Sequence, residues 1–313
     1  MIASIFGKTK PVNHIIVVAF LFLFYWLVHF LRFKKIYTVE EIVWQTAVLG
    51  VLIFSVMIVD FIVKRNKISQ ANSYTILYFA LLMVLFPETL IDNKAVLSGF
   101  FVLLAIRRLV SMRSLKSIKV KIFDASLWIL FASLFYDWAL LYLLVVFMAI
   151  YIYDPKNFRN WLVPFAAFFA VLLLSSGYLA LTDDLEFLPA HFTFKVLFVP
   201  EHILDWANST KWIVYVLGLF VLTILTFIQL GNSGVGKIVT TRIIVFFLII
   251  GLVVDVLISS PSQGHYPILL TFFPTAVLMT NYVELIKREK FREIVLAISI
   301  LVPFIVFVST MLI

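Results

Sequence analysis

The chain has 313 residues, of which 63% are hydrophobic and 13% are charged, and its net charge is +8. Soluble domains are about 45–50% apolar and about 25% charged, so a water-soluble fold of this size is excluded. In an integral membrane protein the surplus apolar surface faces lipid, and the excess of Lys and Arg belongs to cytoplasmic loops. The composition therefore predicts membrane lipids, and no nucleic acid, as binding partners.

The first apolar run follows a short basic stretch that contains Lys8 and Lys10. It is rich in Phe and Trp and too long for a typical signal peptide, so we interpret it as an uncleaved first span. Ten further runs follow, and the pattern predicts an all-α polytopic fold in which residues 1–313 form a single integral membrane domain. The eleven predicted spans lie near residues 14–32, 43–63, 72–87, 93–112, 122–137, 138–153, 160–181, 212–230, 240–259, 266–286 and 294–313.

Three of the predicted spans, near 72–87, 122–137 and 138–153, are shorter than the about 20 residues that a bilayer core requires. The last two meet at Asp137. This junction predicts a tight hairpin at a membrane interface, or alternatively one tilted or re-entrant unit.

The distribution of Lys and Arg predicts the orientation, because cytoplasmic loops of membrane proteins are enriched in both residues. If the N-terminus is cytoplasmic, every inner loop carries basic residues, and most of the 17 acidic residues lie on the outer side. With eleven spans, the C-terminus is then outside. Six of the 25 basic residues fall on the outer side: Arg32, Lys34, Lys35, Lys94, Lys195 and Lys211.

Two carboxylates and a lysine lie close together in the predicted outer loop before the fourth span. Glu88 and Asp92 are four residues apart, and Asn93 and Lys94 follow directly. Such a group could bind a divalent cation or a phosphate-bearing head group. The alternative is that Asp92 or Asn93 is the N-cap of the fourth span. We therefore name Glu88 and Lys94 as candidate substrate-binding residues.

Asp255 and His265 are the other candidate substrate-binding residues. Asp255 lies about four residues from the outer end of the predicted ninth span, and ionisable groups at membrane depth are commonly functional. His265 belongs to the polar segment 259–267 and could act with Asp255 in acid–base chemistry, unless this segment is a plain re-entry turn. The chain has no cysteine and its five histidines are scattered, so the sequence predicts no metal site and indicates no particular cofactor.

Four stretches of the chain resemble a family of polytopic inner-membrane proteins from Bacteroidota: Met1–Pro11, Ile91–Ala95, Phe123–Asp124 and Ser133–Tyr136. The resemblance covers the whole chain and implies a location in the bacterial inner (cytoplasmic) membrane. Members of that family are sometimes labelled β-carotene monooxygenases. The residues of this sequence do not support that activity, because membrane-bound iron oxygenases need several histidines around a metal.

A second resemblance, over about residues 14–180, is to glycosyltransferases of the GT-C type, which use polyprenyl-phosphate-linked sugars. In that family an acidic residue of the first outer loop serves as base or metal ligand, and a later helix opens with an Asp at the outer surface. Glu40 or Glu41 matches the first position and Asp92 the second, so the resemblance implies these three as candidate catalytic residues. This sequence departs from the family in its short first outer loop, its Glu in place of Asp, and its lack of a large outer domain.

Three classes of function are compatible with these patterns. A GT-C-like transferase of lipid-linked sugars in cell-envelope biogenesis requires the first two outer loops to converge on one cavity, where a polyprenyl-phosphate-linked substrate would bind. A transporter or flippase requires buried charge or broken helices near the midplane, with Asp255 and the short spans along its path. A non-catalytic subunit of an envelope complex requires an apolar groove for a partner helix. The resemblance favours the transferase.

Overall fold

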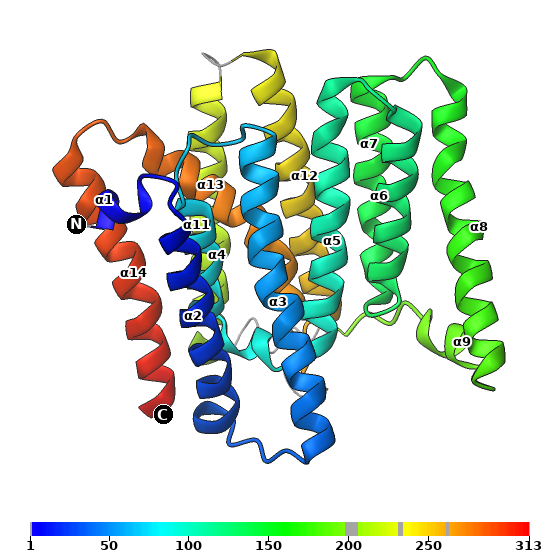
Figure 1. The fold of residues 1–313 in the computed structure, drawn as a ribbon, viewed down its shortest axis with the longest axis horizontal. Coiled ribbons are helices and arrows are strands. Elements are labelled where there is room, and N and C mark those ends of the chain that lie inside the picture. The colour runs from blue at the N-terminus through cyan, green and yellow to red at the C-terminus, as the bar shows by residue number, and fades with distance from the viewer. Residues whose placement is uncertain (1, 198–205, 231–233, 261–262, 313) are drawn as a thin grey trace.

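The computed structural model is a bundle of helices, and it describes residues 2–197, 206–230, 234–260 and 263–312. Within these ranges the chain forms no strand, and one isolated bridge pairs Ser260 with His265. The α-helices run from blue to red in Figure 1 as α1 (Ile2–Phe6), α2 (Pro11–Leu27), α3 (Val39–Arg65), α4 (Tyr74–Leu85), α5 (Asn93–Ser111), α6 (Ile118–Ser133), α7 (Leu143–Tyr153), α8 (Phe158–Leu181), α9 (Phe187–His191), α11 (Trp206–Leu230), α12 (Val235–Ile258), α13 (Phe272–Leu285) and α14 (Glu289–Leu312). Shorter helical turns are the π turn η1 (Val28–Arg32) and the 3-10 turns η2 (Pro87–Leu90), η3 (Met112–Ser114), η4 (Asp137–Tyr142) and η6 (Pro267–Thr271).

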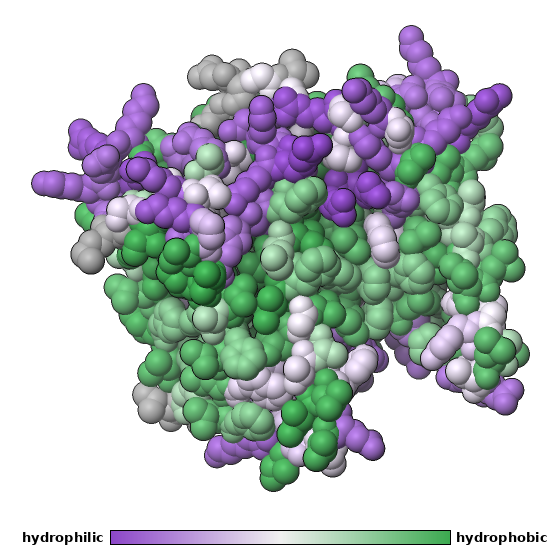
Figure 2. Space-filling view, in the orientation of Figure 1, coloured by the Kyte–Doolittle hydropathy of each residue, from purple (hydrophilic) through white to green (hydrophobic). Residues whose placement is uncertain are grey.

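Eight helical segments of the described chain are long and apolar enough to cross a membrane. They confirm the prediction of an all-α polytopic membrane protein. In the most apolar 18-residue stretch of α8, α11 and α14, only 22%, 17% and 17% of the residues are buried. This is expected for helices that face lipid. Figure 2 shows the resulting band of hydrophobic residues between two hydrophilic ends. The eight segments are Pro11–Arg32, Val39–Arg65, Asn93–Ser114, Phe158–Leu181, Ser209–Ile228, Gly236–Ile258, Pro267–Leu285 and Glu289–Met311.

The three short predicted spans fold as short helices. α4 has 12 residues, α6 has 16 and α7 has 11, and η4 joins α6 to α7. At 1.5 Å per residue α4 is about 18 Å long, well below the thickness of a bilayer core. Every residue of α4 from Tyr74 to Val84 is buried, so α4 is a core helix surrounded by protein. The total of eleven spans and the orientation of the termini stay predictions.

The bundle has two polar ends. We call the end at which α3 and α5 begin the lower end, as drawn in Figure 1, and the end at which they finish the upper end. Hydrophilic residues form a broad layer at the upper end and smaller patches at the lower end (Figure 2). The lower end carries η2, the last turn of α12 and the first turns of α11, all of which position the candidate site.

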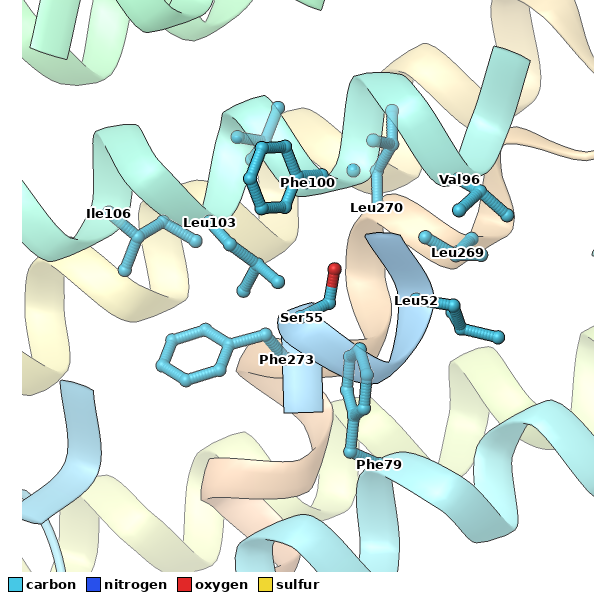
Figure 3. A pocket seen from close by; sticks show the side chains of 12 residues that line it. Leu52, Ser55, Phe79, Val96, Phe100, Leu103, Ile106, Leu269, Leu270 and Phe273 are labelled. Carbon is cyan, nitrogen blue, oxygen red and sulfur yellow. The ribbon is translucent and has the colours of Figure 1, made fainter. Parts of the chain in front are cut away.

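The core between α3, α4 and α5 is closely packed. Figure 3 shows Leu52 of α3, Phe79 of α4 and Val96 of α5 around a cavity of about 10 Å³. A buried water needs about this volume and two to four polar partners. The polar side chain in the lining is Ser55, whose hydroxyl donates to the carbonyl of Val51 at 2.8 Å. This cavity is therefore a small packing void and offers no ligand site.

Candidate functional site

Asp92 is a buried carboxylate that joins three segments at the lower end. As the N-cap of α5, its Oδ1 accepts the backbone N–H of Ala95 at 3.0 Å. Its Oδ2 accepts the hydroxyl of Tyr136, which lies between α6 and η4, and the backbone N–H of Tyr266 at 2.6 Å. Asp92 is 4% exposed. The N-cap alternative from the sequence is thus observed.

His265 lies beside the pair formed by Asp92 and Tyr136. Its ring meets the Tyr136 ring edge-on, with 5.8 Å between the two centroids. The backbones of His265 and Ser260 exchange two hydrogen bonds of 3.1 Å, which close the turn before η6. Gly264 adopts a φ of +71° in this turn, a conformation that glycine takes without steric cost. The turn therefore holds the imidazole of His265 half-buried against Tyr136.

A polar pocket of about 270 Å³ opens beside His265. Its walls come from the first turn of α5, the junction between α6 and η4, the segment 191–197, and the turn before η6. Four lining side chains can carry positive charge, and the lining contains one carboxylate, Asp137. The four are Lys94, His191, Lys195 and His265.

The segment that carries Lys195 is held in place by hydrogen bonds to the start of η4. Asp137 accepts the backbone N–H of Phe194 at 2.9 Å and that of Trp138 at 2.8 Å, one on each carboxylate oxygen. The indole Nε1 of Trp138 donates to the carbonyl of Lys195 at 3.1 Å. Both oxygens of Asp137 are therefore engaged by backbone, and Asp137 does not neutralise the nearby lysines through an ion pair.

The pocket has a basic character. No ion pair within the described ranges joins Lys94 or Lys195 to a carboxylate. His191 donates from Nε2 to the carbonyl of Ser133 at 2.8 Å. Burial lowers the pKa of His265; the charge of Asp92 opposes this shift and that of Lys94 adds to it. His265 is therefore neutral at pH 7 and can accept a proton.

Glu88 and Asp255 lie at the same end, but each is engaged by a residue of α11. Glu88 forms an ion pair with Lys211, with 2.6 Å between Oε1 and Nζ. Trp212 donates from Nε1 to Oδ2 of Asp255 at 2.7 Å, and Asp255 is 2% exposed. The two contacts fix the start of α11 against η2 and α12. Neither carboxylate lines the pocket, and their role in substrate binding stays a prediction.

Glu40 and Glu41 are not brought to the pocket. Both are exposed in the first turn of α3, where Glu41 completes a capping box. Helices α3 and α5 both begin at the lower end (Figure 1), and Leu52 and Val96 line one cavity. At 1.5 Å per residue, Glu40 therefore lies about 12 Å beyond Asp92 along the bundle, before the separation of the two helices is added. Catalytic groups must reach one reacting centre, so the geometry does not support Glu40 and Glu41 as partners of Asp92.

Three side chains of the pocket are not among the predicted site residues: Tyr136, His191 and Lys195. Lys195 had a usable signal, because it is one of six basic residues assigned to the outer side. His191 and Tyr136 had none, since their places depend on contacts between segments far apart in the chain. The hydrogen bond from His191 to the carbonyl of Ser133 joins residues 58 positions apart.

The chemistry of the pocket is that of anion recognition. Ammonium groups donate hydrogen bonds and cannot ligate a cation, whereas they attract phosphate as point charges. Among the residues described, no group of three or more His, Asp or Glu side chains could hold a metal ion. Lys94, Lys195 and the neutral His265 line the same pocket.

Comparison with known proteins finds no matching family model, no matching curated protein and no matching solved structure.

Proposed function

We propose that the protein is a transferase that acts on a lipid-linked substrate of cell-envelope biogenesis at its lower end. It would differ from the GT-C arrangement expected from the sequence, because the first outer loop with Glu40 and Glu41 does not line the pocket. The pocket carries this proposal. Two of the six basic residues of the lower end, Lys94 and Lys195, line it together with His191 and His265. Converging cations at a membrane surface fit a phosphate that is attached to an apolar chain. A polyprenyl-phosphate-linked sugar has this chemistry.

Each pocket residue has a role in the proposed reaction. The bond between the sugar carbon and the phosphate oxygen breaks, and its electron pair stays on the phosphate. Lys94 and Lys195 stabilise the charge on the departing phosphate. His265 accepts the proton of the acceptor hydroxyl, whose oxygen forms the new bond to the sugar carbon. Asp92 and Tyr136 are positioning residues, because they fix the wall against which His265 rests.

The proposal places the protein in the bacterial inner membrane with its upper end in the cytoplasm and its lower end outside. The excess of Lys and Arg at the upper end supports this orientation. The pocket then faces the outer leaflet, where an apolar chain attached to the substrate can remain among the lipids while its phosphate enters from the side.

The transporter and subunit interpretations receive less support from the geometry. A transport path along Asp255 and the short spans would need open polar space, whereas Asp255 is bonded to Trp212. The space beside α4 measures about 10 Å³ and its lining is apolar apart from Ser55. A non-catalytic subunit would bind a partner helix on an apolar outer face of the bundle. Lipid can cover such a face equally well, so an apolar face does not favour this interpretation. The transferase is the function to which the pocket's charges give a specific role.

Native lipids that copurify with the protein test this proposal. We expect mass spectrometry of the purified chain to detect a polyprenyl phosphate or its sugar-linked form. The variant Lys94→Ala with Lys195→Ala should retain at least about tenfold less of this lipid, because each lost charge-assisted hydrogen bond weakens binding by about that factor.

The matched control is Lys34→Ala with Lys35→Ala, which removes two exposed lysines of the same end outside the pocket. It should retain the lipid as the wild type does. Equal loss in both variants, or no phosphate-bearing isoprenoid in the wild type, contradicts the proposal.

A further inference from the structure

A second polar cavity lies at the upper end, remote from the pocket described above. It has a volume of about 730 Å³, within the range of small-molecule sites. Its walls are α1, the loop between α3 and α4, the end of α13 and the start of α14. Figure 1 shows α1 beside the upper part of α14, so the first residues of the described chain form one side of the cavity.

The wall formed by α1 is fixed by hydrogen bonds from both of its ends. Glu293 of α14 accepts the backbone N–H groups of Ile2 and Ala3, the latter at 2.9 Å. The side-chain amide of Asn13 donates to the carbonyls of Ile5 at 3.0 Å and Lys8 at 2.8 Å. These contacts hold α1 in place, so the cavity is a built feature of the fold and its polar side chains have defined positions.

The opposite wall is fixed by Glu284, at the end of α13. Its Oε1 accepts the backbone N–H of Gln70 at 2.8 Å and the side-chain amide of Asn72 at 2.6 Å. Within the described chain its other oxygen makes no hydrogen bond and remains available to the cavity. Glu289, in the first turn of α14, also lines the cavity and accepts no hydrogen bond from a described residue.

Glu284 and Glu289 line this cavity without an ion pair to its basic side chains. Lys8, Lys290 and Arg292 carry positive charge there, and no ion pair in the described ranges joins them to Glu284 or Glu289. The Nε of Arg292 is buried and has no hydrogen-bond partner. A ligand with both a cationic and an anionic group would satisfy both sets of side chains at once.

We propose that this cavity binds a zwitterion that carries a primary ammonium and a phosphate, the head group of a phosphoethanolamine lipid. The carboxylates of Glu284 and Glu289 would accept hydrogen bonds from the ammonium, which donates up to three. Lys8, Lys290 and Arg292 would bind the phosphate. A quaternary ammonium donates no hydrogen bond and is recognised by a cage of aromatic rings, whereas the lining has a single aromatic residue, Tyr74. The cavity therefore discriminates ethanolamine from choline.

Native mass spectrometry of the full chain, reconstituted in equal parts of phosphatidylethanolamine, phosphatidylcholine and phosphatidylglycerol, tests this inference. We expect the wild type to retain phosphatidylethanolamine over phosphatidylcholine by about tenfold as detergent is increased. The variant Glu289→Gln with Lys290→Gln should lose this preference. Both side chains are exposed, so the variant should fold, and an unchanged melting temperature verifies it.

The matched control is Glu186→Gln with Lys287→Gln, which makes the same change of charge at exposed positions outside the cavity. It should keep the preference. Competition by soluble glycerophosphoethanolamine would support recognition of the head group alone, and its failure to compete would support recognition of the intact lipid. Equal retention of the ethanolamine and choline lipids by the wild type, or an unchanged preference in Glu289→Gln with Lys290→Gln, overturns the inference.

Discussion

At the scale of single residues, Asp92 illustrates how one carboxylate can set the geometry of a site without taking part in its chemistry. It is the N-cap of α5 and also accepts the hydroxyl of Tyr136 and the backbone N–H of Tyr266. These three donors already occupy both of its oxygens, so Asp92 is poorly placed to take a proton from an acceptor hydroxyl. The nearby imidazole of His265, which is neutral and lines the pocket, is the better candidate for that task.

His265 should make the stability of the protein depend on pH. Burial lowers the pKa of His265 in the folded chain, while the unfolded chain keeps the ordinary value of about 6.5. As the pH falls below about 6.5, the unfolded chain binds a proton that the folded chain does not yet bind. The free energy of unfolding therefore decreases below about pH 6.5, and the contribution of His265 to it is constant above that pH. The charged and titratable groups that face His265 from neighbouring elements are Asp92, Lys94, Tyr136, Asp137, His191 and Lys195.

The measurement is the melting temperature of the wild type and of His265→Gln in nanodiscs at pH 5.5 and pH 7.5. On acidification, the melting temperature of the wild type should fall more than that of His265→Gln. The other four histidines are common to both chains, so their contribution cancels in the comparison. An identical loss in the two chains would show that His265 titrates as it does in the unfolded state.

At the scale of elements, local signals located helices better than they located the pocket. The predicted second span begins near 43, whereas α3 begins at Val39, because Thr38 and Glu41 form a capping box that extends the helix. That signal is local, and so is the N-cap at Asp92. The wall that carries Lys195 depends instead on Asp137 and Trp138, each 57 residues distant along the chain from its partner. Periodicity and composition carry no information about such a pairing.

Close packing of α12 against η4 and η6 depends on Gly251. A Cβ at this position would lie 2.8 Å from the hydroxyl oxygen of Tyr142 and 3.0 Å from Cγ2 of Thr271. Gly251→Ala should therefore destabilise the protein by about 1–3 kcal/mol through overpacking. The control is Gly218→Ala in α11, where nothing lies within 4 Å of the added Cβ. That change should be neutral or stabilising by up to about 1 kcal/mol, since alanine favours a helix over glycine.

The free energy of unfolding of the wild type and of both glycine variants can be measured in mixed micelles of a mild detergent and a denaturing detergent. A Gly251→Ala protein as stable as the wild type would show that η6 can move away from α12 without cost. The position of the turn that carries His265 would then be less constrained than the packing indicates.

At the scale of the whole molecule, charge is distributed unequally between the two ends. The upper end holds most of the basic residues, and the lower end holds six, two of which line one pocket.

The chain has no cysteine, so single cysteines can report the orientation without further changes. In intact cells, Lys35→Cys at the lower end should react with a membrane-impermeant maleimide. Lys116→Cys at the upper end should react after permeabilisation, and the reverse pattern contradicts the proposed orientation.

If the lower pocket recognises the phosphate of a lipid-linked substrate, it should distinguish two ligands that differ in this group alone. Polyprenyl phosphate and the corresponding polyprenol share the same chain and differ in the phosphate alone. Titrated into the full chain in nanodiscs, the phosphate form should bind at least about tenfold more tightly, because Lys94 and Lys195 of the pocket would contact that group. Equal affinity for the two ligands would show that the pocket does not recognise phosphate and would contradict the proposed transferase function.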